Sequence, residues 1–216
     1  RHYVEAGANI IYSNTFGANR KKLAGHDLGG IIRAGLLNAR KAVENSQAKV
    51  ALDIGPIGEL LEPMGTLKFE EAYDIFKEII IAGRDLADLI VIETMTDLYE
   101  LKAAVLAAKE NSDLPIFTAM TFEEDRRTFA GVNLESFVNA MDGLGVSALG
   151  LNCSLGPKEM YDMVKSLTKM TDLDIIIKPN AGLPDFSGNY NLSVEDFVDQ
   201  MEDIMELGVK YLGGCC

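Results

Sequence analysis

The sequence predicts an α/β fold, a (β/α)8 barrel, and three observations support this class. Short runs rich in Val, Ile and Leu alternate with longer segments that have apolar residues at helical spacing. The runs are apolar almost throughout, as expected for parallel strands buried on both faces. Each run ends in polar residues or in Gly and Pro, which is typical of strand ends around the mouth of a barrel. The competing architecture is an open doubly wound sheet, but no Gly-rich fingerprint follows the first run.

Seven strands and six helices follow from this pattern. The strands are expected at residues 8–14, 49–56, 88–94, 115–122, 147–154, 174–180 and 210–216. The helices are expected at residues 18–46, with an interruption near 25–30, and at 69–87, 97–110, 133–145, 157–170 and 193–208. Local signals support these bounds: Gly55-Pro56 ends the second strand, Asp97 is placed to cap a helix, and Pro157 suits a first helical turn.

A closed barrel requires eight strands, one more than the sequence offers. Residues 1–8 are predicted to be the end of a helix that leads into the first predicted strand, and no helix follows the last predicted strand. We therefore expect residues 1–216 to form a single domain, a barrel that lacks its first strand and last helix and is truncated at both ends. With 216 residues, 48% of them hydrophobic, the chain is long enough to bury one core.

Composition argues against several function classes. The net charge is −13 and no basic patch is present, which argues against a nucleic acid or an anionic membrane as partner. No apolar run reaches the roughly 18 residues that a membrane-spanning helix needs, and the first residues do not resemble a signal peptide. Three cysteines in a chain of this length are no disulfide framework, so we expect a reducing, cytoplasmic location.

The three cysteines, Cys153, Cys215 and Cys216, all lie at the carboxyl ends of expected strands. They admit three interpretations: a metal site, a disulfide with one thiol left over, or three small apolar side chains. A disulfide between neighbours is strained, and three strand-end thiols on one rim favour zinc with its fourth position open. Adjacent side chains in a strand point to opposite faces, so Gly213-Gly214 is expected to supply the freedom that turns both sulfurs toward one ion.

A three-thiolate zinc site suits a particular chemistry. A soft site favours a soft fourth ligand, such as a substrate thiol, and coordination deprotonates that thiol to a nucleophile ready for alkyl transfer. Zinc hydrolases instead rely on His and carboxylate ligands. His2 and His26 lie outside every strand-end cluster, and we interpret both as surface residues.

Six segments together resemble the homocysteine S-methyltransferase domain: SNTFGANRKKL, DIGPIGELLEPMGT, IETMTDLYELKAAVLAAKE, GLNCSLGP, KPNAGLP and GGCC. The resemblance extends over essentially the whole chain, and NCxxGP followed by GGCC is its most specific part. Within the family, the chain is most similar to the homocysteine-binding module of cobalamin-dependent methionine synthases. The resemblance implies a (β/α)8 barrel whose zinc is held by Cys153, Cys215 and Cys216, with homocysteine sulfur in the open position. It also implies that Asn180 occupies the fourth zinc position when substrate is absent.

The resemblance extends to substrate-binding residues. It implies that Glu93 pairs with the amino group of homocysteine, and that Asn14 and Thr15 line the pocket and help to hold the carboxylate end. One departure matters here. The first strand of the family normally ends in a DGxxGT-type turn that adds an acid and backbone amides to this site, and that segment is absent from the sequence.

The implied function is methylation of homocysteine to methionine, with methylcobalamin as the methyl donor. No folate- or cobalamin-binding sequence follows, so cobalamin- and folate-binding domains or proteins are the expected partners. Two alternatives stay open. One keeps the chemistry but uses betaine or S-methylmethionine as donor; the other is a non-catalytic zinc-binding subunit that needs a partner.

Overall fold

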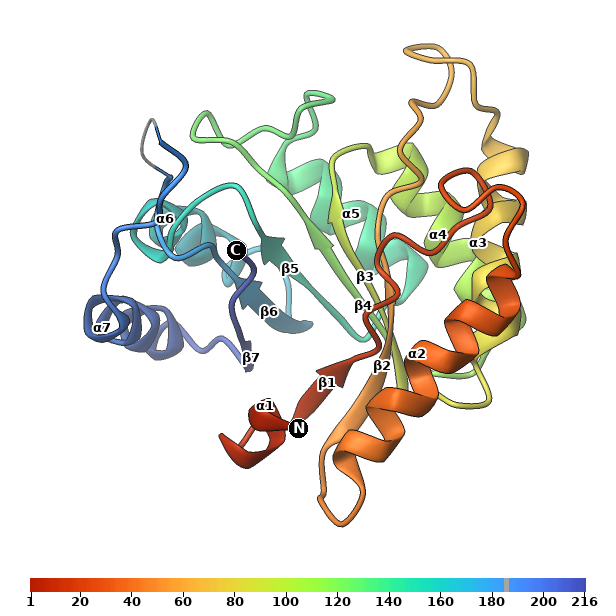
Figure 1. Ribbon diagram of the computed structural model, residues 1–216. Helices are drawn as coiled ribbons and strands as arrows, with labels where there is room; N and C mark the ends of the chain where they lie inside the picture. Colours follow the sequence, from red (N-terminus) through yellow and green to blue (C-terminus); the bar gives the residue numbers. More distant parts are fainter. Residues whose placement is uncertain (185–186) are drawn as a thin grey trace. The chain divides into compact units, whose positions relative to one another are not determined.

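The structure, a computed structural model, describes residues 1–184 and 187–216, in which strands and helices alternate along the chain (Figure 1). The strands are β1 (Ile10–Tyr12), β2 (Lys49–Ile54), β3 (Leu89–Met95), β4 (Ile116–Met120), β5 (Ala148–Asn152), β6 (Asp174–Lys178) and β7 (Tyr211–Leu212). The helices are α1 (His2–Glu5), α2 (Leu28–Val43), α3 (Phe69–Gly83), α4 (Leu98–Asn111), α5 (Leu134–Leu144), α6 (Pro157–Leu167) and α7 (Val194–Glu206). The sheet order follows the chain, from β1 to β7.

The chain divides into two compact units. The first comprises Arg1–Glu93 and Tyr99–Phe117, and the second comprises Thr94–Leu98 and Thr118–Cys216. That residues 1–216 act as one domain stays a prediction. None of the helices in the described residues is long and apolar enough to cross a membrane.

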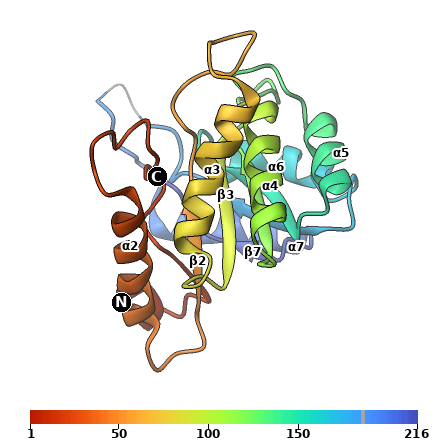
Figure 2. The same ribbon diagram turned by 90° about the vertical axis from the view of Figure 1, so that its right-hand side faces the viewer.

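In the first unit, parallel strands carry helices that bury an apolar stripe against them. β1 pairs with β2, and β2 pairs with β3, all parallel. The side chain of Asp27 caps α2 by accepting the backbone N–H of Gly30, and Ile32 and Leu36 on this helix are completely buried. Figures 1 and 2 show α2 beside α3, and the two helices are in contact.

A polar anchor fixes α2 to this sheet. The carboxylate of Asp88, just before β3, accepts the backbone N–H of Val50 at 2.7 Å and the guanidinium of Arg40 at 2.8 Å. The same guanidinium donates to the carbonyl of Leu86 at 2.7 Å. One partly buried carboxylate therefore connects the start of β2, the start of β3 and helix α2.

The second unit repeats the parallel pattern with β5, β6 and β7. Gly150 in β5 lies opposite Ile176 in β6, and a Cβ atom at position 150 would lie 1.6 Å from the carbonyl oxygen of Ile176. The close approach of these strands therefore requires glycine. Pro157 occupies the first turn of α6, as the sequence predicts, and α6 contacts α7.

Two element predictions are wrong in part. The helix expected at 18–46 begins only at Leu28, because residues 18–27 form turns in which the side chain of Asn19 accepts the backbone N–H groups of Lys21 and Lys22. Gly25, with φ of 82°, precedes the helix cap. The strand expected at 210–216 covers only Tyr211–Leu212, and residues 213–216 are irregular.

Candidate metal centre

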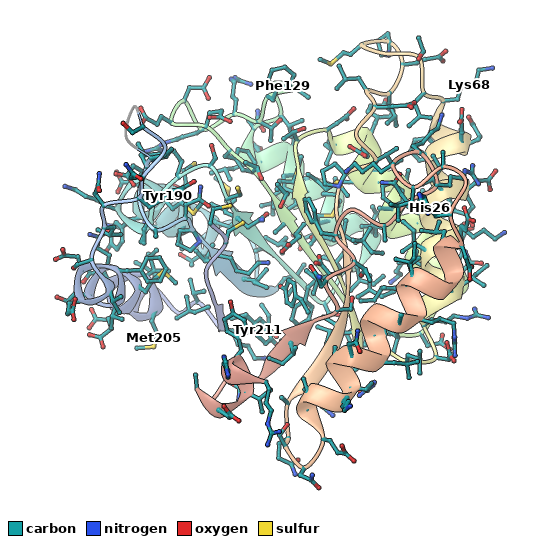
Figure 3. All side chains as sticks on the ribbon, viewed as in Figure 1. His26, Lys68, Phe129, Tyr190, Met205 and Tyr211 are labelled. Carbon is teal, nitrogen blue, oxygen red and sulfur yellow. The ribbon has the colours of Figure 1, made fainter. Side chains whose placement is uncertain are left out.

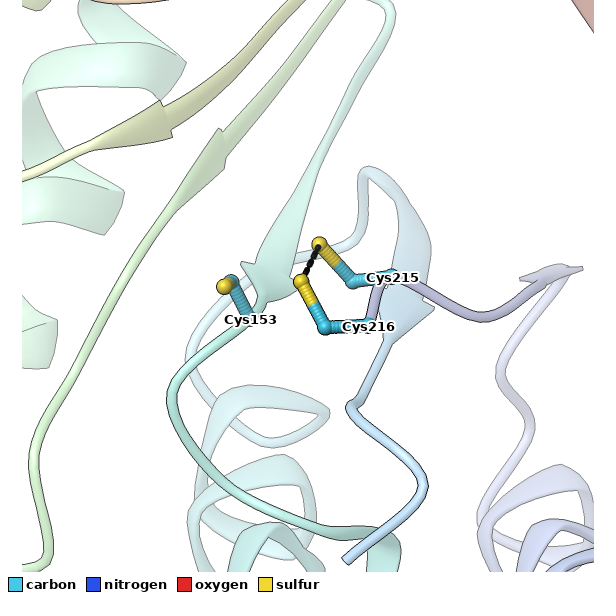
Figure 4. A group of neighbouring side chains, drawn as sticks. All are labelled: Cys153, Cys215 and Cys216. Atoms are coloured by element: carbon cyan, nitrogen blue, oxygen red, sulfur yellow. Dashed lines mark hydrogen bonds between the residues drawn. The ribbon is translucent and has the colours of Figure 1, made fainter. Parts of the chain in front are cut away.

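The thiols of Cys153, Cys215 and Cys216 come together in the second unit (Figure 4). Their sulfur atoms all lie within 4.8 Å of one another, and those of Cys215 and Cys216 are 4.0 Å apart. A tetrahedral zinc ion with bonds of about 2.3 Å to sulfur places its sulfur ligands about 3.8 Å apart. The three cysteines therefore fit a zinc ion after a contraction of less than about 1 Å between any two sulfurs.

One short backbone segment, Lys178–Ala181, holds all three cysteines. The carbonyl of Lys178 accepts the N–H of Cys153 at 3.0 Å, and the carbonyl of Pro179 accepts the N–H of Cys215 at 2.9 Å. The N–H of Ala181 donates to the carbonyl of Cys216 at 2.6 Å. The end of β6 thus sets the spacing between cysteines that lie 62 residues apart in the chain.

The backbone departs from strand geometry at Cys153 and, as expected, over residues 213–216. That Gly213 and Gly214 supply this freedom stays a prediction. Cys153 and Ser154 have φ of 62° and 64°, in the left-handed region, whereas Gly213 and Gly214 do not. Adjacent cysteines can face one ion here because residues 213–216 lie outside the strand, so the alternation of strand side chains does not apply to them. The unusual conformation falls on Cys153 because its N–H stays bonded to β6 while the chain turns away.

Two asparagine side chains complete the surroundings of the sulfurs. The Oδ1 atom of Asn180 accepts the backbone N–H of Cys216 at 3.1 Å, and the Nδ2 atom of Asn152 donates to the sulfur of Cys215 at 3.7 Å. Both asparagines are buried, whereas Cys215 and Cys216 are exposed and Cys153 is half-buried. Two buried amides thus contact the cysteines, and the cysteines themselves are accessible to solvent, as an open catalytic metal site requires.

The pKa values of the three thiols differ from one another. The pKa of Cys153 is lowered to about 5, chiefly by a hydrogen bond from the Cys215 thiol and also by the backbone N–H of Ser154. That same hydrogen bond, together with burial, raises the pKa of Cys215, and desolvation together with the Cys153 thiolate raises the pKa of Cys216. Without a metal ion, the site therefore holds a single thiolate at neutral pH, on Cys153.

The structure brings Asn180 to the cysteines, as expected of a residue at this rim, but its amide oxygen is engaged with the Cys216 backbone. Three other expected site residues, Asn14, Thr15 and Glu93, belong to the first unit. Asn14 is exposed, with φ of 56°, and Glu93 is buried near the end of β3. Their part in substrate binding stays a prediction.

Thr15 has a structural contact that the sequence does not reveal. Its hydroxyl donates to the carbonyl of Asp53 at 2.7 Å, and it lies 2.6 Å from the hydroxyl of Ser13. Thr15 therefore ties the end of β1 to β2. Both histidines are exposed, as predicted, and Figure 3 shows His26 on the segment that leads into α2.

Sequence reasoning missed the role of Asn152 and Thr94. Both lie near the carboxyl ends of the strands predicted at residues 88–94 and 147–154. Only the folded chain shows that their side chains are in contact, with Asn152 Nδ2 donating to Thr94 Oγ1 at 2.7 Å. The signal in the sequence was the position of Asn152 directly before Cys153. An amide in the strand at that point is placed to support a neighbouring ligand.

The chain is similar to proteins of one enzyme family. The family model described as homocysteine S-methyltransferase matches residues 1–216. The chain is 31% identical to the methionine synthases of Mycobacterium leprae and of Mycobacterium tuberculosis, in both cases over 100% of this chain. It spans 19% and 20% of the length of these two relatives, about a fifth of each.

Solved structures show the fold. The chain superposes on the homocysteine methyltransferase MmuM from Escherichia coli with a TM-score of 0.84 for the oxidized form, at 22% identity. The score for the metallated form is 0.83, at 23% identity; in both cases 99% of this chain and 77% of the MmuM chain are covered. Seven parallel strands that alternate with helices, together with this likeness, confirm the (β/α)8 barrel class among the described residues. The chain belongs to the homocysteine S-methyltransferase family.

Proposed function

We propose that this chain binds homocysteine and activates its thiol for methylation to methionine, as the homocysteine-binding module of a methionine synthase. The observation that carries the proposal is the convergence of three solvent-accessible cysteines, Cys153, Cys215 and Cys216, beside two buried asparagine side chains. Family membership and the two mycobacterial relatives support the same substrate. Because the thiols must stay reduced, the proposal places the chain in a reducing compartment such as the cytoplasm.

The three cysteines would hold a zinc ion, and the spacing of their sulfurs fits its tetrahedral geometry. A metallated form of MmuM supports this assignment by analogy. When bound, zinc would supply the positive charge that keeps the homocysteine thiol deprotonated at neutral pH. Asn180 would hold Cys216 in place, and in the absence of substrate its amide would be the candidate for the fourth position.

The remaining roles follow from the chemistry of the substrate. A buried carboxylate at the end of β3 is suited to pair with an ammonium group, so Glu93 would bind the amino group of homocysteine. Asn14 and Thr15 would lie near the substrate carboxylate. The homocysteine sulfur then forms the new bond to the methyl carbon, and the donor keeps the electron pair of the bond that breaks.

Methylcobalamin is the proposed donor. The chain spans about a fifth of the two methionine synthases, so in proteins of that length other domains would carry the cobalamin and the folate. A second candidate is the same reaction with betaine or S-methylmethionine as the methyl donor. A third hypothesis is a zinc-binding subunit without catalytic activity of its own. Such a chain would bind zinc but would form no methionine unless a partner protein is added.

An assay with each methyl donor in turn distinguishes these three hypotheses. The reduced, zinc-loaded chain is mixed with homocysteine and, in turn, with methylcobalamin, S-methylmethionine and betaine, and methionine is measured. We expect methionine with methylcobalamin and none from the Cys215→Ala variant. Methionine from only one of the other two donors would replace the proposed donor. Full turnover by Cys215→Ala would overturn the assignment of the site.

A further inference from the structure

The side chain of Asn152 forms three hydrogen bonds at the metal centre, although it is no expected ligand. Its exposed fraction is 0%. The Oδ1 atom accepts the backbone N–H of Thr94 at 2.8 Å, and the Nδ2 atom donates to Thr94 Oγ1 at 2.7 Å and to the sulfur of Cys215 at 3.7 Å. Both amide protons and the amide oxygen are therefore engaged.

The orientation of this amide is fixed by Thr94. A backbone N–H can only donate, so the amide oxygen must face it, and the amide N–H groups must then face the hydroxyl and the sulfur. A flipped amide would set a donor against the N–H of Thr94 and an oxygen against the sulfur of Cys215. The direction of the N–H toward sulfur is thus a consequence of the backbone at residue 94.

Thr94 itself is held in an uncommon conformation. Its φ of 60° lies in the left-handed region, which costs a β-branched residue about 1–3 kcal/mol. The reciprocal bonds to Asn152 offset that cost, because they use both the N–H and the hydroxyl that this conformation presents.

We propose that Asn152 is a positioning residue that sets the direction and lowers the electron density of the Cys215 sulfur through an N–H···S hydrogen bond. The inference rests on the proposed function of the site. Three thiolates around a divalent ion carry a net charge of −1, and a substrate thiolate would bring it to −2. An N–H donor directed at one sulfur disperses part of that charge, and such contacts around a metal tune its affinity and reactivity.

Two variants remove the N–H donors in different ways. Asn152→Asp keeps an acceptor for the Thr94 N–H, and Asn152→Ala adds no charge. Loss of the donor should leave the Cys215 sulfur more electron-rich. In the cobalt(II)-substituted chain, both variants should therefore shift the sulfur-to-cobalt charge-transfer band to lower energy. Both should also weaken zinc binding about 10- to 100-fold.

The matched control is Thr94→Val, which keeps the shape of the side chain and the backbone N–H but removes the hydroxyl acceptor. Its band should stay at the wild-type energy, because the N–H···S contact is retained. An unmoved band in both Asn152 variants would overturn the inference. A shift of equal size in Thr94→Val would do the same, since the effect would then belong to the strand end and not to the sulfur contact.

A measurement on the wild-type chain keeps the inference testable if the variants do not fold. In ¹⁵N-labelled protein loaded with ¹¹³Cd, the side-chain amide of Asn152 should show scalar coupling to cadmium through the Cys215 sulfur. Assigned amide resonances without coupling would overturn the inference while the bound cadmium upheld the three-cysteine site. Failure to bind cadmium or zinc at all would contradict the proposed function itself, and the inference with it.

Discussion

The side-chain oxygen of Asn180 accepts the backbone N–H of Cys216 at 3.1 Å, so the last cysteine is held by the loop that follows β6. This contact makes Asn180 a support for the ligands as well as a candidate for the open metal position. Asn180→Ala should weaken zinc binding about 10- to 100-fold, as loss of outer contacts at metal sites does. Competition with a chromogenic chelator measures the affinity.

The control for this prediction is Asn180→Asp, which keeps an oxygen acceptor for the Cys216 N–H. It should retain most of the zinc affinity. If Asn180→Ala bound zinc as tightly as the wild type, the contact with Cys216 would have no part in the site.

The sequence was sufficient to predict the strands, the helices that follow them and the meeting of three thiols, because these depend on periodicity and on where strands end. Local detail was harder to predict. The turns at residues 18–27 depend on the side chain of Asn19, which competes with helix formation. The left-handed backbone at Cys153 and Thr94 follows from contacts with other strands, and no pattern of neighbouring residues encodes it.

Proton release on metal binding should reveal the single thiolate of the metal-free site. At pH 7 Cys153, with a pKa of about 5, is already deprotonated, whereas the raised pKa values of Cys215 and Cys216 keep both protonated. Zinc binding should release about two protons, so the apparent affinity should rise about a hundredfold per pH unit near neutrality. Below pH 5 Cys153 also binds a proton, and the slope should steepen to about three.

Calorimetry in buffers with different ionisation enthalpies counts these protons. Release of three protons at pH 7 would mean that Cys153 is an ordinary thiol and that the hydrogen bond from Cys215 does not form.

Gly150 should be essential for the second unit. Any side chain at this position would collide with the carbonyl of Ile176, which lies on the strand before the segment that holds the cysteines. Gly150→Ala should lower the free energy of unfolding by at least about 3 kcal/mol, the upper part of the range for overpacking. Denaturant unfolding followed by circular dichroism tests this.

The matched control is Gly143→Ala in helix α5, where an added Cβ meets nothing within 4 Å. That change should stabilise the protein by about 0.5–1 kcal/mol, because alanine favours the helix. Equal stability of the two variants would contradict the close packing of β5 and β6.

The anchor at Asp88 should make stability depend on pH. Burial opposes ionisation, but Arg40 and the backbone N–H of Val50 prevail and lower the pKa of Asp88. This stabilisation is present above the ordinary carboxyl pKa of about 3.9 and is lost as pH falls through the lower folded value. Asp88→Asn should cost about 1 kcal/mol at pH 7, and the difference from wild type should vanish in acid.

Asp85→Asn is the control, because Asp85 pairs with Arg33 on the exposed surface. It should leave the unfolding midpoint at pH 7 unchanged. An Asp88→Asn protein as stable as wild type at pH 7 would remove Asp88 from the anchor of α2.

X-ray absorption at the zinc edge, on zinc-loaded, reduced protein with and without homocysteine, tests the proposed site most directly. We expect one zinc ion per chain with three sulfur ligands at about 2.3 Å, and a fourth sulfur ligand when homocysteine is added. A chain that folds but retains no zinc, or a sulfur count that homocysteine does not change, would contradict activation of the substrate thiol at Cys153, Cys215 and Cys216.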